Sequence, residues 1–145
     1  MKNIEIRLIP KNRLPDIFPL LQECDSGITK KTLQERFEQM CEANYRCVGI
    51  YDNNKLIGIS GLWILVKYYV GKHIEPDNVY ILPEYRMAGI GRRLMTWIEE
   101  YAKKEGCRAI ELNCYKVNKQ GQAFWEQLGY TPLGIHYKKI IKFFY

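Results

Sequence analysis

The chain has 145 residues, of which 47% are hydrophobic, which is enough for one well-filled core and too little for two ordinary domains. Its 22 lysines and arginines exceed its 16 acidic residues, and the formal charge of +6 favours an anionic partner such as a nucleotide. No run of five or six like charges marks a nucleic-acid-binding arm and no apolar stretch reaches about 18 residues, so we predict a single domain over residues 1–145 without a nucleic-acid or membrane partner.

The spacing of apolar residues predicts an α+β fold. In chain order the predicted elements are a strand at 1–9, helices at 13–23 and 30–43, strands at 46–51, 55–66 and 78–82, a helix from Ile90 that Gly106 ends, a strand at 108–114, a short helix between Asn118 and Gly129, and strands at 130–135 and 137–144. The compact turn Asp52-Asn53-Asn54 makes the second and third strands an antiparallel hairpin. The helix from Ile90 connects two strands by a right-handed crossover, which predicts that those strands are parallel.

The cysteines and histidines give no metal or disulfide signal. Five cysteines form no C-x-x-C pair, and the N-terminus lacks the apolar core of a signal peptide, so we predict reduced thiols and a cytoplasmic location. His73 and His136 have no cysteine or acidic partners at motif spacing, and each is expected to be a surface or half-buried structural residue. Cys114 is conceivable as a nucleophile but is not favoured as one. We predict no metal.

The segment at 84–95, EYRMAGIGRRLM, lies between a predicted strand and a predicted helix. Such a turn points unpaired N–H groups outward at the positive end of the helix dipole, where a phosphate binds well. Gly89 and Gly91 would allow a ligand to approach the backbone closely, and three arginines beside them add positive charge. An ordinary glycine-bearing loop with surface arginines is the structural alternative.

Two familiar phosphate motifs do not fit this segment. A P-loop needs Lys and then Ser or Thr after its last glycine, whereas Gly91 is followed by Arg92-Arg93. A dinucleotide fingerprint needs a third small residue where Leu94 stands, and the chain ends too soon after Glu111 to complete a doubly wound sheet.

The pattern that fits is R-x-x-G-x-G, here Arg86-Met87-Ala88-Gly89-Ile90-Gly91. It resembles motif A of the GNAT superfamily of N-acetyltransferases, whose loop cradles the pyrophosphate of acetyl-CoA. Asn118 with Phe124-Trp125-Glu126-Gln127-Leu128-Gly129-Tyr130 looks like motif B of the same superfamily. The resemblance covers most of the chain and implies the acyl-CoA N-acyltransferase fold, with a mixed, mostly antiparallel sheet flanked by helices and a splayed pair of parallel strands.

The resemblance also implies which residues hold acetyl-CoA as a cosubstrate. The strand before the loop would bulge, and backbone groups of Ile81 and Leu82 would bond the pantetheine arm. The pyrophosphate would be held by the amides of the loop together with two arginine side chains, and these residues are Arg86, Met87, Ala88, Gly89, Ile90, Gly91 and Arg92. Asn118 would bond the pantetheine. Gly121 departs from the usual Ala of motif B, at a cost of about 1 kcal/mol of helix propensity.

The residue at one expected catalytic position differs from the one that many members of the superfamily have. Trp125 stands where many members have a Tyr that protonates the departing CoA thiolate, and Trp has no titratable hydroxyl. Because a thiol has a pKa near ~8.5, its thiolate is a fair leaving group. We therefore predict slower but genuine transfer, with the proton supplied by water or by Tyr115 or Tyr130.

An acceptor amine with a pKa near ~10.4 is neutral in only about one molecule in a few thousand at pH 7, so a base must take its proton. The resemblance points to acidic residues before and within the strand that leads to the loop. Asp77 is the first candidate because it should lie at the strand entrance, facing the gap, and Glu75 is the second. Glu84 is expected to be loop structure, and a strand-initiating turn is the alternative role for Asp77.

The predicted function is transfer of an acetyl group directly to a primary amine of a small molecule or peptide. In this fold the segment between the first two helices, about 22–31, would govern the choice of acceptor, and Asp25 could attract a cationic amine. The alternative is a non-catalytic acyl-CoA-binding or sensor module, which Trp125 supports. The apolar end of the chain, IIKFFY, could pair across a homodimer or cover its own sheet.

Overall fold

The computed structural model describes residues 3–142. The chain divides into two compact units, Met1–Leu112 and Asn113–Tyr145. The first unit contains the sheet with three α-helices, and the second contains one short helix. No helix in the described part of the chain combines the length and the apolar character that a bilayer crossing requires.

The sheet of the first unit has five strands in the order β1-β2-β3-β4-β5. They are β1 (Ile4–Leu8), β2 (Arg46–Asp52), β3 (Lys55–Lys67), β4 (Gly71–Ile81) and β5 (Ala109–Ile110). The first three pairings are antiparallel and the pairing of β4 with β5 is parallel. Asn53 and Asn54 close the predicted hairpin with φ of 48° and 72°, as a type I′ turn requires. The predicted mixed, mostly antiparallel sheet is confirmed.

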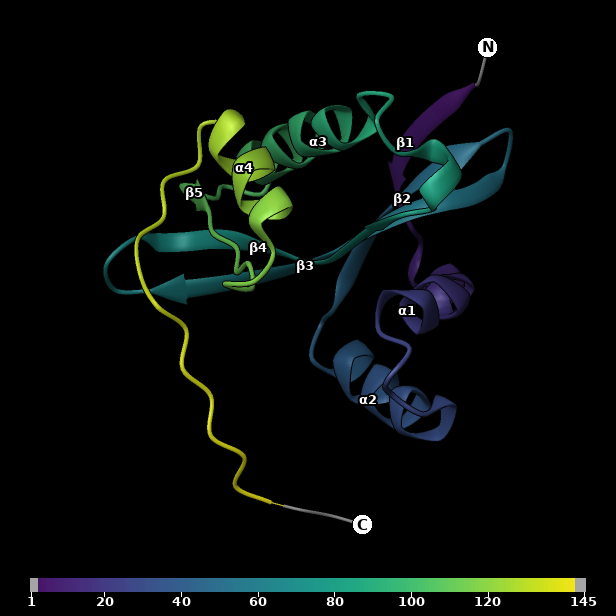
Figure 1. Cartoon of the computed structure of the whole chain (residues 1–145), viewed down its shortest axis with the longest axis horizontal. Coiled ribbons are helices and arrows are strands. Elements are labelled where there is room, and N and C mark those ends of the chain that lie inside the picture. Colours follow the sequence, from purple (N-terminus) through teal and green to yellow (C-terminus); the bar gives the residue numbers. More distant parts are fainter. Residues whose placement is uncertain (1–2, 143–145) are drawn as a thin grey trace. The chain divides into compact units, whose positions relative to one another are not determined.

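Helices cover this sheet on both sides (Figure 1). They are a 3-10 segment η1 (Lys11–Ile17), α1 (Phe18–Cys24), α2 (Lys30–Glu42) and α3 (Ile90–Lys104). The predicted helix at 13–23 begins as 3-10 because Pro15 and Pro19 supply no N–H to an α-helical ladder. The helix predicted at 30–43 is confirmed, and the Thr29 side chain caps it by accepting from the Thr32 N–H at 3.2 Å.

Apolar side chains on alternate strand positions and on single helix faces form the core. One cluster joins η1, α1 and α2 to the sheet through residues such as Ile17, Phe37 and Cys47. On α3, Leu94 and Ile98 are fully buried, and each such side chain contributes roughly 1.5–3 kcal/mol. The sheet and the buried face of α3 together carry the segment at 84–95.

The structure corrects four predicted elements. β4 begins at Gly71 rather than at 78, since its first half mixes charged residues with Pro76 and carries no apolar run to mark a strand. β5 has two residues instead of the predicted 108–114. The strands predicted at 130–135 and 137–144 are wrong as far as residue 142, because these residues are mostly exposed and pair with no strand; residues 143 and 144 lie outside the described range.

Candidate active site

The bulge implied for the strand before the loop is present in β4. Ile59 of β3 pairs with Tyr80, but Gly61 pairs with Asp77, so β4 has one residue more than β3 between these pairs. Asn78 lies in this stretch with φ of 53°, a left-handed conformation that Asn tolerates better than most residues. A bulge of this kind bends the strand and re-aims its side chains.

β4 and β5 separate soon after they meet. Their pairing covers two residues of each strand, and their last backbone bond joins the Glu111 N–H to the Ile74 carbonyl at 3.0 Å. Residues 75–81 of β4 have no parallel partner in the sheet that the structure describes. The edge of β4 is thus open where the predicted splayed pair requires it.

Ile81 and Leu82 differ in what their backbones offer. The Leu82 N–H already donates to the Ile57 carbonyl at 2.9 Å, so it has no hydrogen left for a cofactor. Because antiparallel residues alternate in direction, the N–H and C=O groups of Ile81 point to the open edge of β4. The Ile81 carbonyl accepts from Arg86 Nε at 2.7 Å. Of the two predicted pantetheine contacts, only Ile81 has a suitable backbone direction.

The loop after β4 leads into α3 by way of two residues with positive φ, Met87 at 65° and Gly89 at 77°. Residues 86–89 are exposed, and no atom lies within 4 Å of the place a Cβ of Gly89 would occupy. The Arg93 N–H is the first to bond within α3, to the Gly89 carbonyl at 3.2 Å. The amides of residues 90–92 precede it and have no intrahelical acceptor. Residues 86–89 therefore form an exposed turn, with the buried Ile90 anchoring the start of α3 and Arg86 and Arg92 adding positive charge on either side.

Both candidate bases lie on one face of β4. Asp77 pairs with Gly61 and Glu75 with Trp63, so strand alternation places both carboxylates on the same face as the Trp63 indole. The indole donates to Asp77 Oδ2 at 3.1 Å. Asp77 is exposed and sits six residues into β4, which begins at Gly71, so the prediction of a place at the strand entrance is wrong.

Glu75 belongs to a cluster that the sequence pattern did not predict. His73 is fully buried, with Nε2 at 2.8 Å from Glu75 Oε2 and 4.0 Å from Glu111 Oε1. The Tyr69 hydroxyl donates to Glu111 Oε1 at 2.6 Å, and this bond raises the pKa of Tyr69. The expectation that His73 is a surface or half-buried residue without partners is wrong. Alternation of His73 and Glu75 was the available signal, but it required recognising a strand at 71–77.

The segment between α1 and α2 approaches the same face. Burial raises the pKa of the Cys24 thiol, and the negative charges of Asp77 and Asp25 raise it further. The Tyr45 hydroxyl is buried over Gly61 without a hydrogen-bond partner among residues 3–142, and burial raises its pKa. Aromatic rings and carboxylates therefore meet between α1 and the β3–β4 pair.

The second unit contains Asn118 and the helix α4 (Lys119–Gln127), which carries Trp125. Asn118 caps this helix, its Oδ1 accepting from the Gly121 N–H at 2.9 Å. A Cβ at Gly121 would lie 2.4 Å from Asn118 Nδ2, which explains the departure from Ala. Trp125 is half-buried and packs edge-on against Tyr130, with ring centroids 5.6 Å apart. Asn118 thus keeps an amide donor, Nδ2, that the cap does not use.

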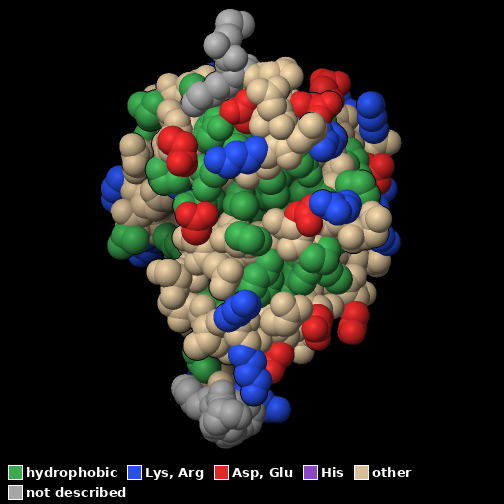
Figure 2. Space-filling model, turned by 90° about the vertical axis from the view of Figure 1, so that its right-hand side faces the viewer, with side chains coloured by type: hydrophobic (Ala, Val, Ile, Leu, Met, Phe, Trp, Pro, Cys, Tyr) green, Lys and Arg blue, Asp and Glu red, His purple; other side chains and the backbone are tan. Residues whose placement is uncertain are grey.

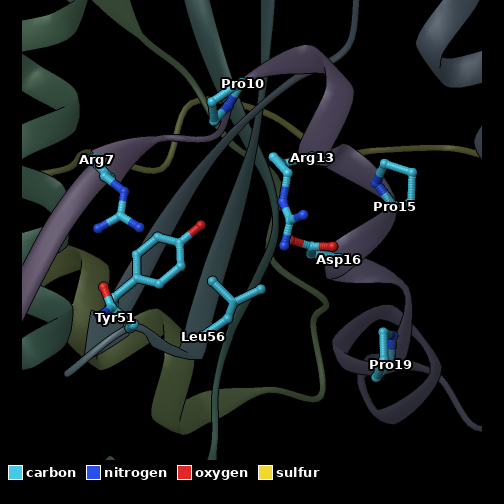
Figure 3. Close-up of a pocket in the computed structure, with 9 residues that line it drawn as sticks. Arg7, Pro10, Arg13, Pro15, Asp16, Pro19, Tyr51 and Leu56 are labelled. Atoms are coloured by element: carbon cyan, nitrogen blue, oxygen red, sulfur yellow. The ribbon is translucent and has the colours of Figure 1, made fainter.

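A separate cavity of about 740 Å³ opens beside β1, η1 and the β2–β3 hairpin (Figure 3). Its two arginines already have partners, because Arg7 stacks 3.7 Å from the Tyr51 ring and Arg13 pairs with Asp16 at 2.8 Å. It contains none of the predicted site residues. Figure 2 shows positive and negative side chains interspersed among hydrophobic ones over one face of the molecule, which is unlike the basic stripe of a nucleic-acid binder.

Comparison with known proteins agrees with this geometry. A family model described as the acetyltransferase (GNAT) family matches residues 14–130. The chain is 27% identical over 78 residues to a thialysine N-epsilon-acetyltransferase of Sus scrofa, covering 54% of the chain and 46% of that protein. It is 28% identical over 96 residues to an aminoglycoside N(6')-acetyltransferase type 1 of Acinetobacter genomosp. 13, covering 62% and 66%.

A solved structure of an aminoglycoside N-acetyltransferase, AAC(6')-Iy in complex with CoA, superposes with a TM-score of 0.81. The identity is 19%, and 96% of each chain is covered. At this identity the likeness concerns the fold. The chain spans about half the length of the thialysine acetyltransferases that it matches.

Proposed function

The chain belongs to the acetyltransferase (GNAT) family, and from this premise we propose that it transfers an acetyl group from acetyl-CoA directly to a primary amine of a small molecule or peptide. The observation that carries the proposal is the exposed turn of residues 86–89 at the start of α3, beside the open edge of β4. A turn of that shape can hold a diphosphate, and a strand edge beside it can guide the attached arm.

The donor would be held mostly by main-chain groups. The amides of residues 87–91 would bind the pyrophosphate, with Arg86 and Arg92 adding charge. The Ile81 N–H would donate to the pantetheine arm, and its carbonyl would become available if Arg86 moved to a phosphate. Asn118 Nδ2 would provide a further donor. Leu82 has no part in this proposal because its N–H is used within the sheet.

The acceptor amine would lose its proton to Asp77 or Glu75. Each is accessible to solvent and lies on the face shared with Trp63, which suits a proton acceptor at the open edge of β4. Such help is typically worth about 10²- to 10⁴-fold in rate. The substitutions Asp77→Asn and Glu75→Gln, compared in the pH profile of kcat/KM, identify which carboxylate is required.

The CoA thiolate would leave without the usual tyrosine. Trp125 cannot donate a proton from oxygen, so water, Tyr115 or Tyr130 would supply it. Trp125→Tyr is expected to raise kcat if this position faces the thiolate. An unchanged kcat would show that the position has no role in proton delivery here.

A cationic acceptor fits the charges on this face. Asp25, Asp77, Glu75 and Glu111 all lie on or near it, while the loop that would hold the donor is basic. The acidic face would attract the cationic acceptor, and the basic loop would attract the anionic cofactor.

A coupled assay of CoA release over polyamines, amino acids, aminoglycosides and peptides tests the proposal, with mass spectrometry to identify the acetylated product. Turnover on at least one amine is expected. Tight binding of acetyl-CoA without turnover on any of these amines would favour the rival function, a non-catalytic acyl-CoA sensor. The presence of Trp125 in place of the usual Tyr is the observation behind that rival. A cytoplasmic location and a homodimer stay predictions, to be checked by fractionation and by light scattering.

A further inference from the structure

His73 is a buried base whose two ring nitrogens both face acceptors. Nδ1 lies 3.3 Å from the Gly71 carbonyl oxygen, which can only accept a hydrogen bond. Nε2 lies 2.8 Å from Glu75 Oε2. A hydrogen on each ring nitrogen would let both nitrogens donate, whereas the neutral ring carries only one such hydrogen. With both hydrogens present, His73 would be an imidazolium that donates a charge-assisted bond to the Glu75 carboxylate.

The charged side chains around His73 would compensate a positive charge on its ring. Glu111, at the end of β5, places Oε1 at 4.0 Å from Nε2, and Tyr69 of the β3–β4 turn donates to that same oxygen. Lys67, at the end of β3, lies at 4.0 Å from Glu75 Oε2. One imidazolium, one ammonium and two carboxylates sum to zero, which is the condition for keeping ionised groups in a partly buried site.

The cluster is layered from the interior to the surface. The His73 side chain is 0% exposed, whereas those of Glu75 and Glu111 are 23% and 25% exposed. Both glutamates stand where the β4–β5 ladder ends, at the start of the open edge. The imidazole thus stands behind two carboxylates that reach solvent at the point where the proposed site begins.

We propose that His73 is a positioning residue for acetyl transfer, fixing Glu75 Oε2 by a charged hydrogen bond so that Glu75 Oε1 meets the ammonium of a cationic acceptor. Glu111 assists by compensating the same imidazolium. This inference rests on the proposed function and adds to it a buried cation that orients the acidic side of the site. No bond other than N–H and O–H is made or broken in this step, since the proton of the ammonium passes to the free oxygen of Glu75.

A metal ion is the competing explanation of the same three residues. One ligand atom from each of His73, Glu75 and Glu111 lies within 4.8 Å of the others. However, Tyr69 already donates to Glu111 Oε1 at 2.6 Å, and the Lys67 ammonium, 4.0 Å from Glu75 Oε2, would repel a metal cation. The protonated cluster is therefore favoured, and zinc becomes an outcome of the test.

The first experiment needs no acceptor. Nitrogen-15 NMR of the two histidines, with His136→Gln to assign them, should show both ring nitrogens of His73 protonated at pH 7, and only one protonated in Glu75→Gln. An unprotonated nitrogen at either position of the His73 ring in the wild-type chain would overturn the proposal. So would a stoichiometric change in the His73 signals on adding zinc chloride alone. Because this measurement is independent of turnover, failure of the proposed function would not be mistaken for failure of this inference.

The second experiment is a double-mutant cycle measured with the best acceptor from the amine panel. Glu75→Gln and His73→Leu should each lower kcat/KM for the amine about tenfold or more, and the double variant should lose no more than Glu75→Gln alone. Asp77→Asn is the control, and its loss should add to that of His73→Leu. His73→Gln, which keeps a donor, should recover part of the activity. Losses that add for His73 and Glu75, or a Glu75→Gln variant with full activity, would contradict the proposal.

Discussion

Gly89 and Gly106 stand at opposite ends of α3 in the same conformation, each with φ of 77° and with no other atom within 4 Å of the place that a Cβ would occupy. Replacing either by Ala places a Cβ in the left-handed region, at a cost of about 1–2 kcal/mol. With about 2.1 cal/mol/K per residue over 145 residues, that cost corresponds to a fall in Tm of about 3–7 °C for each variant.

Only one of the two glycines faces the proposed cofactor. A Cβ at Gly89 would project from the turn that holds the pyrophosphate, so Gly89→Ala should weaken binding of CoA by at least about tenfold, or about 1.4 kcal/mol. Gly106→Ala should leave the affinity unchanged. Calorimetric titration of each variant with CoA measures the difference, and thermal melts verify that the two are equally destabilised. Equal affinities in the two variants would refute the assignment of the turn.

Three further predictions concern stability and pH. Gly61→Ala would place Cβ 2.4 Å from the Tyr45 hydroxyl and should cost about 1–3 kcal/mol in urea unfolding, with part of the loss recovered by adding Tyr45→Phe. Arg46 donates to Glu105 at 2.6 Å and lowers the pKa of that carboxyl, so its contribution of about 0.2–1 kcal/mol is present above the unfolded pKa of about 4.3 and is lost as pH falls through the folded pKa. The Tm difference between wild type and Glu105→Gln should accordingly close in acid, and a gap that is constant from pH 7 to pH 3 would contradict this. If Asp77 is the base, Asp77→Asn should abolish the rise of kcat/KM with pH, whereas an unaltered rise would exclude it.

Most of the fold follows from local sequence signals. The hairpin is specified by Asn53 and Asn54, which accept positive φ, and α3 is specified by apolar residues at helical spacing between Gly89 and Gly106. Each of these signals depends on residues that are close together in the sequence, so it can be recognised without knowledge of the tertiary structure. The loop of the candidate site could be located for the same reason, because its glycines and arginines are contiguous.

The acidic cluster could not be predicted because its members meet only through the tertiary pairing of strands. His73 and Glu111 come together because β4 runs parallel to β5 in one particular register, and no local pattern encodes that register. The strands predicted at 130–135 and 137–144 were wrong, as far as residue 142, for a different reason. Ile140 and Ile141 favour a strand by propensity, but up to residue 142 the chain after α4 pairs with no strand, and propensity alone does not complete a strand's hydrogen bonds.

The surplus residue of β4 has a consequence for how this strand can change. Because side chains alternate with a period of two, it acts as a phase shift between the half of the strand that carries Glu75 and Asp77 and the half that leads to the loop. Deleting Asn78 would leave one residue opposite Ser60, so the pairings of Asp77 with Gly61 and of Tyr80 with Ile59 could persist in a regular ladder, with both carboxylates on their present face. The loss of that one amino acid would therefore remove the bend that opens the strand edge while leaving the acidic face in place.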